Sequence, residues 1–103
     1  MSRIVKADVN VEEAIPFIFS LSPNHPNPFN PATSIPFTLA TESEITLTVY
    51  NIAGEKVLTL ADGNYSAGAH SLDWNASEFA SGVYFCQLRA GDFVETRKMT
   101  LVK

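Results

Sequence analysis

Four prolines fall within the nine residues 23–31, and this spacing constrains the fold more than any other feature of the chain. Each proline fixes its own φ and favours an extended or turn conformation in the residue before it. Asparagines, which favour turns, and the aromatic Phe29 lie between the prolines. We therefore predict a stiff segment that is neither helix nor sheet, and we call Pro26–Pro31 the proline block. We expect Phe29 to fill one end of a hydrophobic core; the alternative is that the block is an exposed recognition epitope.

Apolar and polar residues alternate along most of the chain, and no helical stripe is present. This period predicts seven strands, with tight turns at 51–54 and 90–93 and loops at 61–68 and 75–82, the second with room for a helical turn at 77–80. The expected strands are residues 15–21, 35–39, 45–50, 56–60, 70–74, 83–89 and 94–102. Pro36 suits an edge strand because it cannot donate a ladder hydrogen bond. Together these elements predict an all-β, seven-stranded antiparallel β-sandwich of the immunoglobulin-like kind.

A chain of 103 residues has room for one domain, and an apolar fraction of 46% with 17% charged residues is typical of a globular protein. No apolar run approaches the roughly 18 residues that cross a bilayer, so we expect no membrane insertion. Residues 1–14 are polar and are expected to be a linker or lead-in that precedes the sandwich of residues 15–103. The first eight residues lack the apolar core of a secretory signal peptide.

The net charge of −4 disfavours nucleic acid, whose recognition needs a basic surface. Residues 89–103 carry four cations against two acids, so the last strand is basic on an acidic body. A receptor could read this charge. The alternative is that the cations only keep an exposed edge strand from aggregating.

The sequence offers little chemistry for catalysis, and we predict no catalytic residue, no metal site and no cofactor. The single cysteine, Cys86, excludes an internal disulfide and is expected to be a small buried side chain. Neither His25 nor His70 belongs to a signature that joins it to a nucleophile, and the acids are scattered singly.

Several aromatic and glycine residues are predicted to serve the fold. Trp74 shares a strand face with Leu72 and is expected in the core. A carbohydrate-binding module would instead expose an aromatic strip, here Tyr65, Trp74 and Phe79. Tyr50 and Tyr84 are each expected to bury the ring and to bond a backbone group through the hydroxyl. Turns that need positive φ are expected at four glycines, Gly54, Gly68, Gly82 and Gly91.

Five blocks in order resemble the type A C-terminal sorting domain of type IX secretion cargo proteins, found in Bacteroidetes and related bacteria. The blocks cover roughly residues 17–103, and the immunoglobulin-like domain of the flagellar hook-capping protein is similar in two of them. They are Pro26, Asn27, Pro28, Phe29, Asn30 and Pro31 with Thr33, Ile35 and Phe37; Val49 to Gly54; Gly68 to His70 with Trp74; Ala80 to Tyr84, with Gly82 and Val83; and Arg97 to Met99 running to Lys103.

This resemblance implies a non-catalytic address that directs an attached cargo through an outer-membrane translocon to the cell surface or outside. It also implies that a surface sortase removes the domain, and that an N-terminal cargo domain, which these 103 residues do not contain, belongs to the precursor. The alternatives are a structural or ligand-binding immunoglobulin-like interaction module attached to a secreted enzyme, and a hook-capping-like assembly protein.

The last strand is the predicted contact with the translocon. We expect Met99 and Leu101 to face the core and the basic groups to stay accessible, so that a receptor reads them by charge or adds a strand to this edge. The candidate residues are Arg97, Lys98, Met99, Leu101, Val102 and Lys103.

Overall fold

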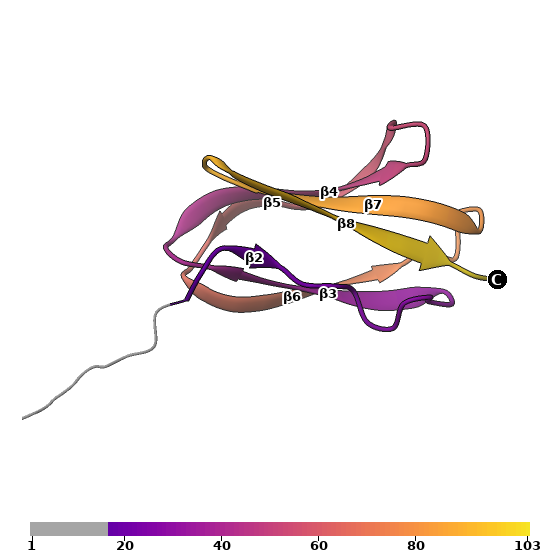
Figure 1. The fold of residues 1–103 in the computed structure, drawn as a ribbon, viewed down its shortest axis with the longest axis horizontal. Helices are drawn as coiled ribbons and strands as arrows, with labels where there is room; N and C mark the ends of the chain where they lie inside the picture. Colours follow the sequence, from indigo (N-terminus) through magenta and orange to yellow (C-terminus); the bar gives the residue numbers. More distant parts are fainter. Residues whose placement is uncertain (1–16) are drawn as a thin grey trace, which may run out of the picture.

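The structure is a computed structural model that describes residues 17–103, and this part of the chain forms seven antiparallel strands in two sheets (Figure 1). The strands are β2 (Ser20–Leu21), β3 (Ala32–Leu39), β4 (Ser43–Asn51), β5 (Lys56–Tyr65), β6 (Gly68–Asn75), β7 (Gly82–Ala90) and β8 (Phe93–Leu101). The predicted all-β, seven-stranded antiparallel sandwich is confirmed. Residues 1–14 and the first two residues of the strand expected at 15–21 lie outside the described residues.

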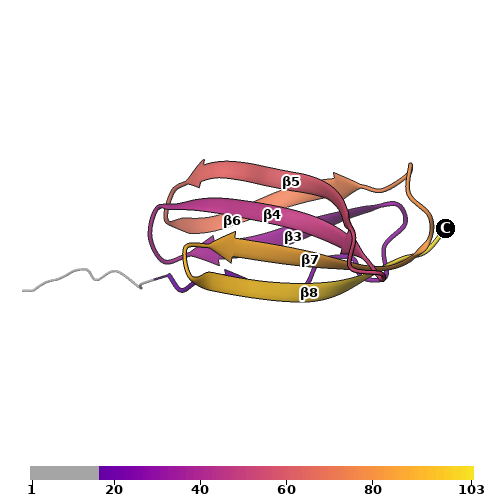
Figure 2. The same ribbon diagram turned by 90° about the horizontal axis from the view of Figure 1, so that it is seen from above.

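The two sheets lie face to face. The smaller sheet has the order β2-β3-β6, and the larger sheet has the order β5-β4-β7-β8, which Figure 2 shows from above. Edge strand β8 of the larger sheet runs beside edge strand β2 of the smaller one, so the two sheets meet along this side.

Alternation of apolar and polar residues builds the core, because every second side chain of a strand points to the same face. In β4, Ile45, Leu47 and Val49 are at most 2% exposed, and Cys86 and Leu88 of the neighbouring β7 are equally buried. Full burial of one such aliphatic side chain contributes about 1.5–3 kcal/mol. The predicted burial of Cys86 is confirmed, because this residue is 1% exposed.

The strand expected at 15–21 is much shorter than predicted. Only Ser20 and Leu21 pair with β3, and Phe17 is 50% exposed. After Leu21 the Ser22 N–H donates to the Pro36 carbonyl (3.0 Å), but Pro36 has no N–H to return the bond, so regular pairing does not continue on that side.

The placement of Pro36 on an edge strand was wrong. It lies in β3, the central strand of the smaller sheet. Its carbonyl faces Ser22, and the nitrogen of a strand residue points to the same side as its carbonyl, so the missing donor costs the β3–β6 ladder nothing.

The loop predicted at 61–68 was also wrong, because β5 continues to Tyr65 and only Ser66 and Ala67 connect it to β6. Asp62, Gly63 and Asn64 favour turns as isolated residues. Here they pair with β4, and cross-strand pairing overrides that preference. Residues 77–80 form no helical turn; the Phe79 N–H donates to the Ala76 carbonyl (3.0 Å) in a single tight turn.

Candidate functional site

Phe29, Trp74 and Tyr84 come from three different motif blocks. Their rings meet at the end of the sandwich where the described chain terminates (Figure 1). The Phe29 ring is 1% exposed, and its centroid lies 5.6 Å from that of Trp74. The Trp74 ring lies 5.5 Å from those of both Phe79 and Tyr84. Phe29 therefore fills one end of the core as predicted, and its side chain is not part of an exposed epitope.

The proline block adds its own backbone to the outer edge of β8. The Phe29 N–H donates to the Thr100 carbonyl (2.9 Å), and the Phe29 carbonyl accepts from the Val102 N–H (2.9 Å). These two bonds make a parallel bridge between Phe29 and Leu101. The block thereby occupies hydrogen-bonding positions that an exposed edge strand would offer to another chain.

The Asn27 side chain continues this contact in place of a backbone amide. Its Oδ1 accepts from the Thr100 N–H (3.0 Å), and its Nδ2 donates to the Lys98 carbonyl (3.4 Å). Together with Phe29, Asn27 closes the edge of β8 from Lys98 to Val102.

Two buried polar side chains hold the proline block from inside. Thr33 Oγ1 donates to the Pro26 carbonyl (2.9 Å), and Asn24 Nδ2 lies 3.1 Å from the same carbonyl and 3.0 Å from Thr33 Oγ1. The Pro31 carbonyl accepts from the Ala76 N–H (2.9 Å), which ties the far end of the block to the 75–82 connection. The peptide bonds before Pro26, Pro28 and Pro31 are cis. The sequence does not reveal the role of Asn24, because nothing in it separates this buried asparagine from the exposed Asn27 and Asn30.

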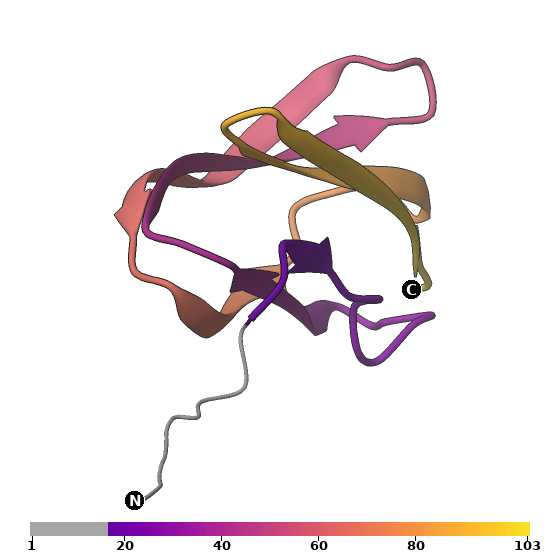
Figure 3. The same cartoon turned by 60° about the vertical axis from the view of Figure 1, so that its left-hand side comes forward.

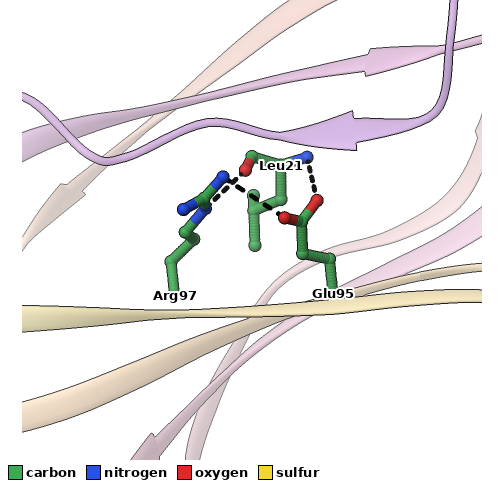
Figure 4. A network of polar contacts seen from close by, with 3 residues as sticks. All are labelled: Leu21, Glu95 and Arg97. Atoms are coloured by element: carbon green, nitrogen blue, oxygen red, sulfur yellow. Dashed lines mark hydrogen bonds and ion pairs between the residues drawn. The ribbon is translucent and has the colours of Figure 1, made fainter.

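A second contact joins β8 to Leu21 of β2 (Figure 4). Glu95 Oε1 accepts from the Leu21 N–H (2.9 Å), and Arg97 Nε donates to the Leu21 carbonyl (2.8 Å). The two side chains also form an ion pair, with 3.2 Å between Arg97 Nη2 and Glu95 Oε2. The guanidinium of Arg97 is therefore bound to the fold, which corrects the expectation that the basic groups of this strand are simply accessible.

The other tail candidates divide into buried and exposed residues. Met99 and Leu101 are 0% and 2% exposed and face the core, as predicted. Lys98, Val102 and Lys103 are exposed, and Lys103 Nζ donates to the Ser77 carbonyl (2.8 Å). Of the six candidates these three are exposed in the folded domain, and Arg97 is half-buried.

The remaining motif residues have structural positions. Tyr84 donates from its hydroxyl to the Ala80 carbonyl (2.5 Å), as predicted, and Gly82 (φ +148°) begins β7 with Val83 beside it. Gly54 (φ +82°) lies in the β4–β5 turn, and Gly68 (φ +122°) lies at the opposite end of the sandwich, so these two do not join the site. All four predicted glycines, Gly91 included, have positive φ.

Tyr50 differs from the prediction. It lies half-buried on the outer face of the larger sheet, and its hydroxyl has no hydrogen-bond partner within residues 17–103.

The aromatic strip of a carbohydrate-binding module is missing from residues 17–103. Trp74 is only 3% exposed, and Tyr65 packs edge-on against Phe37 and His70.

Within residues 17–103 no three side chains of His, Cys, Asp or Glu gather as metal ligands, and no helix there could cross a membrane. Burial raises the pKa of the Cys86 thiol to about 12, so this thiol stays protonated at neutral pH.

Comparison with known proteins places this arrangement in a family. The model of the family described as "Secretion system C-terminal sorting domain" matches residues 25–103, from His25 beside the proline block to the last residue. A search of curated proteins found no match. The chain therefore belongs to this family of type IX secretion sorting domains. The family is a non-catalytic C-terminal signal, carried by precursors that are exported to the cell surface or outside, and it implies interaction with the type IX secretion machinery.

Proposed function

We propose that the type IX translocon binds this sorting domain through the exposed side chains of Lys98, Val102 and Lys103, at the end where the proline block closes the edge of β8. The observation that carries this proposal is the division of the tail: these three side chains are exposed, whereas Met99 and Leu101 are buried and Arg97 is bound to Leu21. Arg97, Met99 and Leu101 then act by keeping the end folded.

Addition of a strand to β8 is the less favoured mode of binding. The backbone positions at Lys98, Thr100 and Val102 are taken by Asn27 and Phe29. An incoming strand would have to displace the proline block together with the buried Phe29 ring, and removal of such a ring from a core costs about 3–5 kcal/mol. Recognition by side chains needs no such displacement.

Charge supports the same surface. The two lysines stand on a protein of net charge −4, so they mark a basic end on an acidic body. Local charge of this kind speeds and orients the encounter with a complementary partner more than it raises affinity.

We further propose that a surface sortase removes the domain by cleavage within residues 1–22, after an N-terminal cargo has been exported. Phe17 and Ile18 are 50% and 69% exposed, whereas the chain from Leu21 onward is hydrogen-bonded into the fold. An exposed peptide before the first long strand is accessible to a processing enzyme.

The test is export of a reporter that carries a Sec signal and is fused ahead of the full chain, in a bacterium with type IX secretion. The test variant combines Lys98→Ala, Val102→Ser and Lys103→Ala. Lys98→Arg with Lys103→Arg keeps the charge, and Ile18→Ser removes a more exposed apolar side chain at the other end. A translocon-deficient strain gives the baseline.

Export should fall to that baseline for the combined variant and persist in both controls, while circular dichroism and the melting temperature of the purified domains stay unchanged. Normal export of the folded combined variant would overturn the assignment of these residues. An immunoblot of the exported reporter reports cleavage: retention of the intact domain outside the cell would overturn the proposed sortase step.

A further inference from the structure

A hollow on the outer face of the larger sheet is lined by none of the three residues proposed to bind the translocon, although Lys98 stands beside it. It has a volume of about 420 Å³ and lies between the tip of the β4–β5 hairpin and β7. Its floor and walls include Tyr50 and Ile52 from the hairpin and Phe85, Gln87 and Arg89 from β7. The hollow is therefore built from side chains that point away from the core.

Two β-bulges explain its shape. The register between β4 and β5 shifts between Leu47 and Thr48 and again between Val49 and Tyr50. Each bulge bends a strand pair and increases its twist. The tip of the hairpin accordingly rises away from β7 and β8, as Figures 1 and 3 show. The hollow lies beside this tip.

The lining of the hollow is mixed: Tyr50, Ile52 and Phe85 form its apolar and aromatic part, and the rest is polar side chains and a glycine. Phe85 and Tyr50 lie directly opposite each other in the β4–β7 ladder, and both rings are half-buried. Ile52 at the hairpin tip is 75% exposed, the highest value among the large apolar residues of the part that the structure describes. An exposed isoleucine beside two accessible rings gives a partner apolar area to cover.

One cation lines the hollow, and two more are cross-strand neighbours of its two aromatic residues. Arg89 lines the hollow, Lys98 is the cross-strand partner of Phe85, and Lys56 is the cross-strand partner of Tyr50. Within residues 17–103 none of the three forms an ion pair. The nearest acid in the sequence, Glu55, accepts a hydrogen bond from the Asn51 side chain (2.9 Å). The rim therefore carries more positive than negative charge, although Asp62 lies on the same face beyond Thr46, on a protein whose net charge is negative.

We propose that this hollow binds a short acidic peptide segment of a partner protein, with one aromatic or large apolar side chain placed on Tyr50 and Phe85. The volume suits one or two side chains and not an extended polymer. The net charge of −4 opposes a long polyanion such as nucleic acid, whereas a few carboxylates reach only the positive rim. Arg89 can bind a carboxylate through two parallel hydrogen bonds.

The proposal is tested with the full chain and three synthetic peptides, followed by ¹H–¹⁵N correlation spectra at low and high salt. The probe is a pentapeptide of acidic residues around a central Phe. One control peptide replaces the acids by their amides, and the other replaces the Phe by Ala. The acidic Phe peptide should shift the amides of Ile52, Phe85 and Arg89, and both controls should shift them less.

Substitutions locate the contact. Arg89→Ala should weaken binding about tenfold, the change expected on loss of one charge-assisted contact, and Arg89→Lys should recover part of that loss. Ile52→Ser should also weaken binding, whereas Ile18→Ser, an equally exposed isoleucine away from the hollow, should not. All three sites are exposed, so the fold is expected to survive.

Three results would overturn the proposal: equal binding of the amide peptide, shifts confined to another surface, or no shifts at millimolar peptide. Concentration-dependent shifts at the hollow without any peptide would also overturn it, because they would identify a second copy of the chain as the occupant.

Discussion

The segment between Leu21 and Phe29 contacts β8 at two places, and the two contacts are built from different groups. At Leu21, the side chains of Glu95 and Arg97 reach across to a backbone N–H and carbonyl (Figure 4). At Phe29, the backbone of the proline block bonds directly to the backbone of β8, and the Phe29 ring enters the core.

The two contacts with β8 are stabilised by different interactions and should respond differently to solvent and salt. The Leu21 contact rests on charged side chains, with Arg97 and Glu95 41% and 32% exposed, so solvent and salt weaken it. The Phe29 contact rests on apolar burial and on backbone groups that every residue carries. The proline block should therefore contribute most of the stability of this end, and the charged contact should fix the position of β2.

Phe29→Ala should have the largest effect, because it removes a ring that is 1% exposed and leaves a cavity beside Trp74. The free energy of unfolding should fall by about 3–5 kcal/mol, as measured by urea denaturation. Phe17→Ala, which removes a half-exposed ring, is the matched control and should cost far less. Equal losses for the two variants would show that the proline block is not the main anchor.

Arg97→Ala should rank second. It leaves the carbonyl of fully buried Leu21 without the Arg97 hydrogen bond, and an unsatisfied buried group costs about 1–3 kcal/mol. Arg89→Ala removes the same side chain from an exposed position and should stay within about 0.5 kcal/mol. If both arginines contribute equally in denaturation experiments, the contact with Leu21 carries no stability.

Asn27→Ala should destabilise by about 1 kcal/mol, since its two hydrogen bonds to Lys98 and Thr100 are exposed to solvent. Asn30→Ala is the control at an exposed asparagine of the same block, whose side chain has no hydrogen bond within residues 17–103. A loss as large for Asn30→Ala would mean that the block, and not the Asn27 amide, sets the stability of the edge.

Glu95→Gln should have the smallest effect on stability. The amide oxygen can still accept from the Leu21 N–H, and only the exposed ion pair with Arg97 is lost, worth about 0.5 kcal/mol. The difference from wild type should vanish when thermal melts are repeated in 1 M NaCl, because salt screens exposed charges. A loss that persists at high salt would contradict the electrostatic origin of this contact.

Much of the fold could be predicted from the sequence because alternation is a local signal. Ile45, Leu47 and Val49 indicate a strand and its buried face without knowledge of any other strand. The errors came where a partner decides the outcome. Asp62 to Asn64 have the residue types of a loop, but they pair with β4 and continue β5. Pro36 has the residue type of an edge strand, but a second chain segment bonds to its carbonyl through the Ser22 N–H.

The site was predictable in part for the same reason. The burial of Phe29, Met99 and Leu101 follows from residue type and strand period. The bonds from Arg97 to Leu21 and from Asn27 to Thr100 join residues more than 70 positions apart, so no local pattern could reveal them. The bond from Arg97 separates this candidate, which is used by the fold, from the exposed Lys98, Val102 and Lys103.

The most direct measurement of whether the proline block closes the edge of β8 is amide hydrogen exchange along that strand, in wild type and in Asn27→Ala. The Thr100 and Val102 amides, which donate to Asn27 and Phe29, should exchange slowly, whereas those of Val94 and Thr96 point to the same outer edge without a partner in residues 17–103 and should exchange fast. In Asn27→Ala, Thr100 should lose protection while Val102 keeps it. Uniformly fast exchange of all four amides in the wild-type domain would contradict the closed edge.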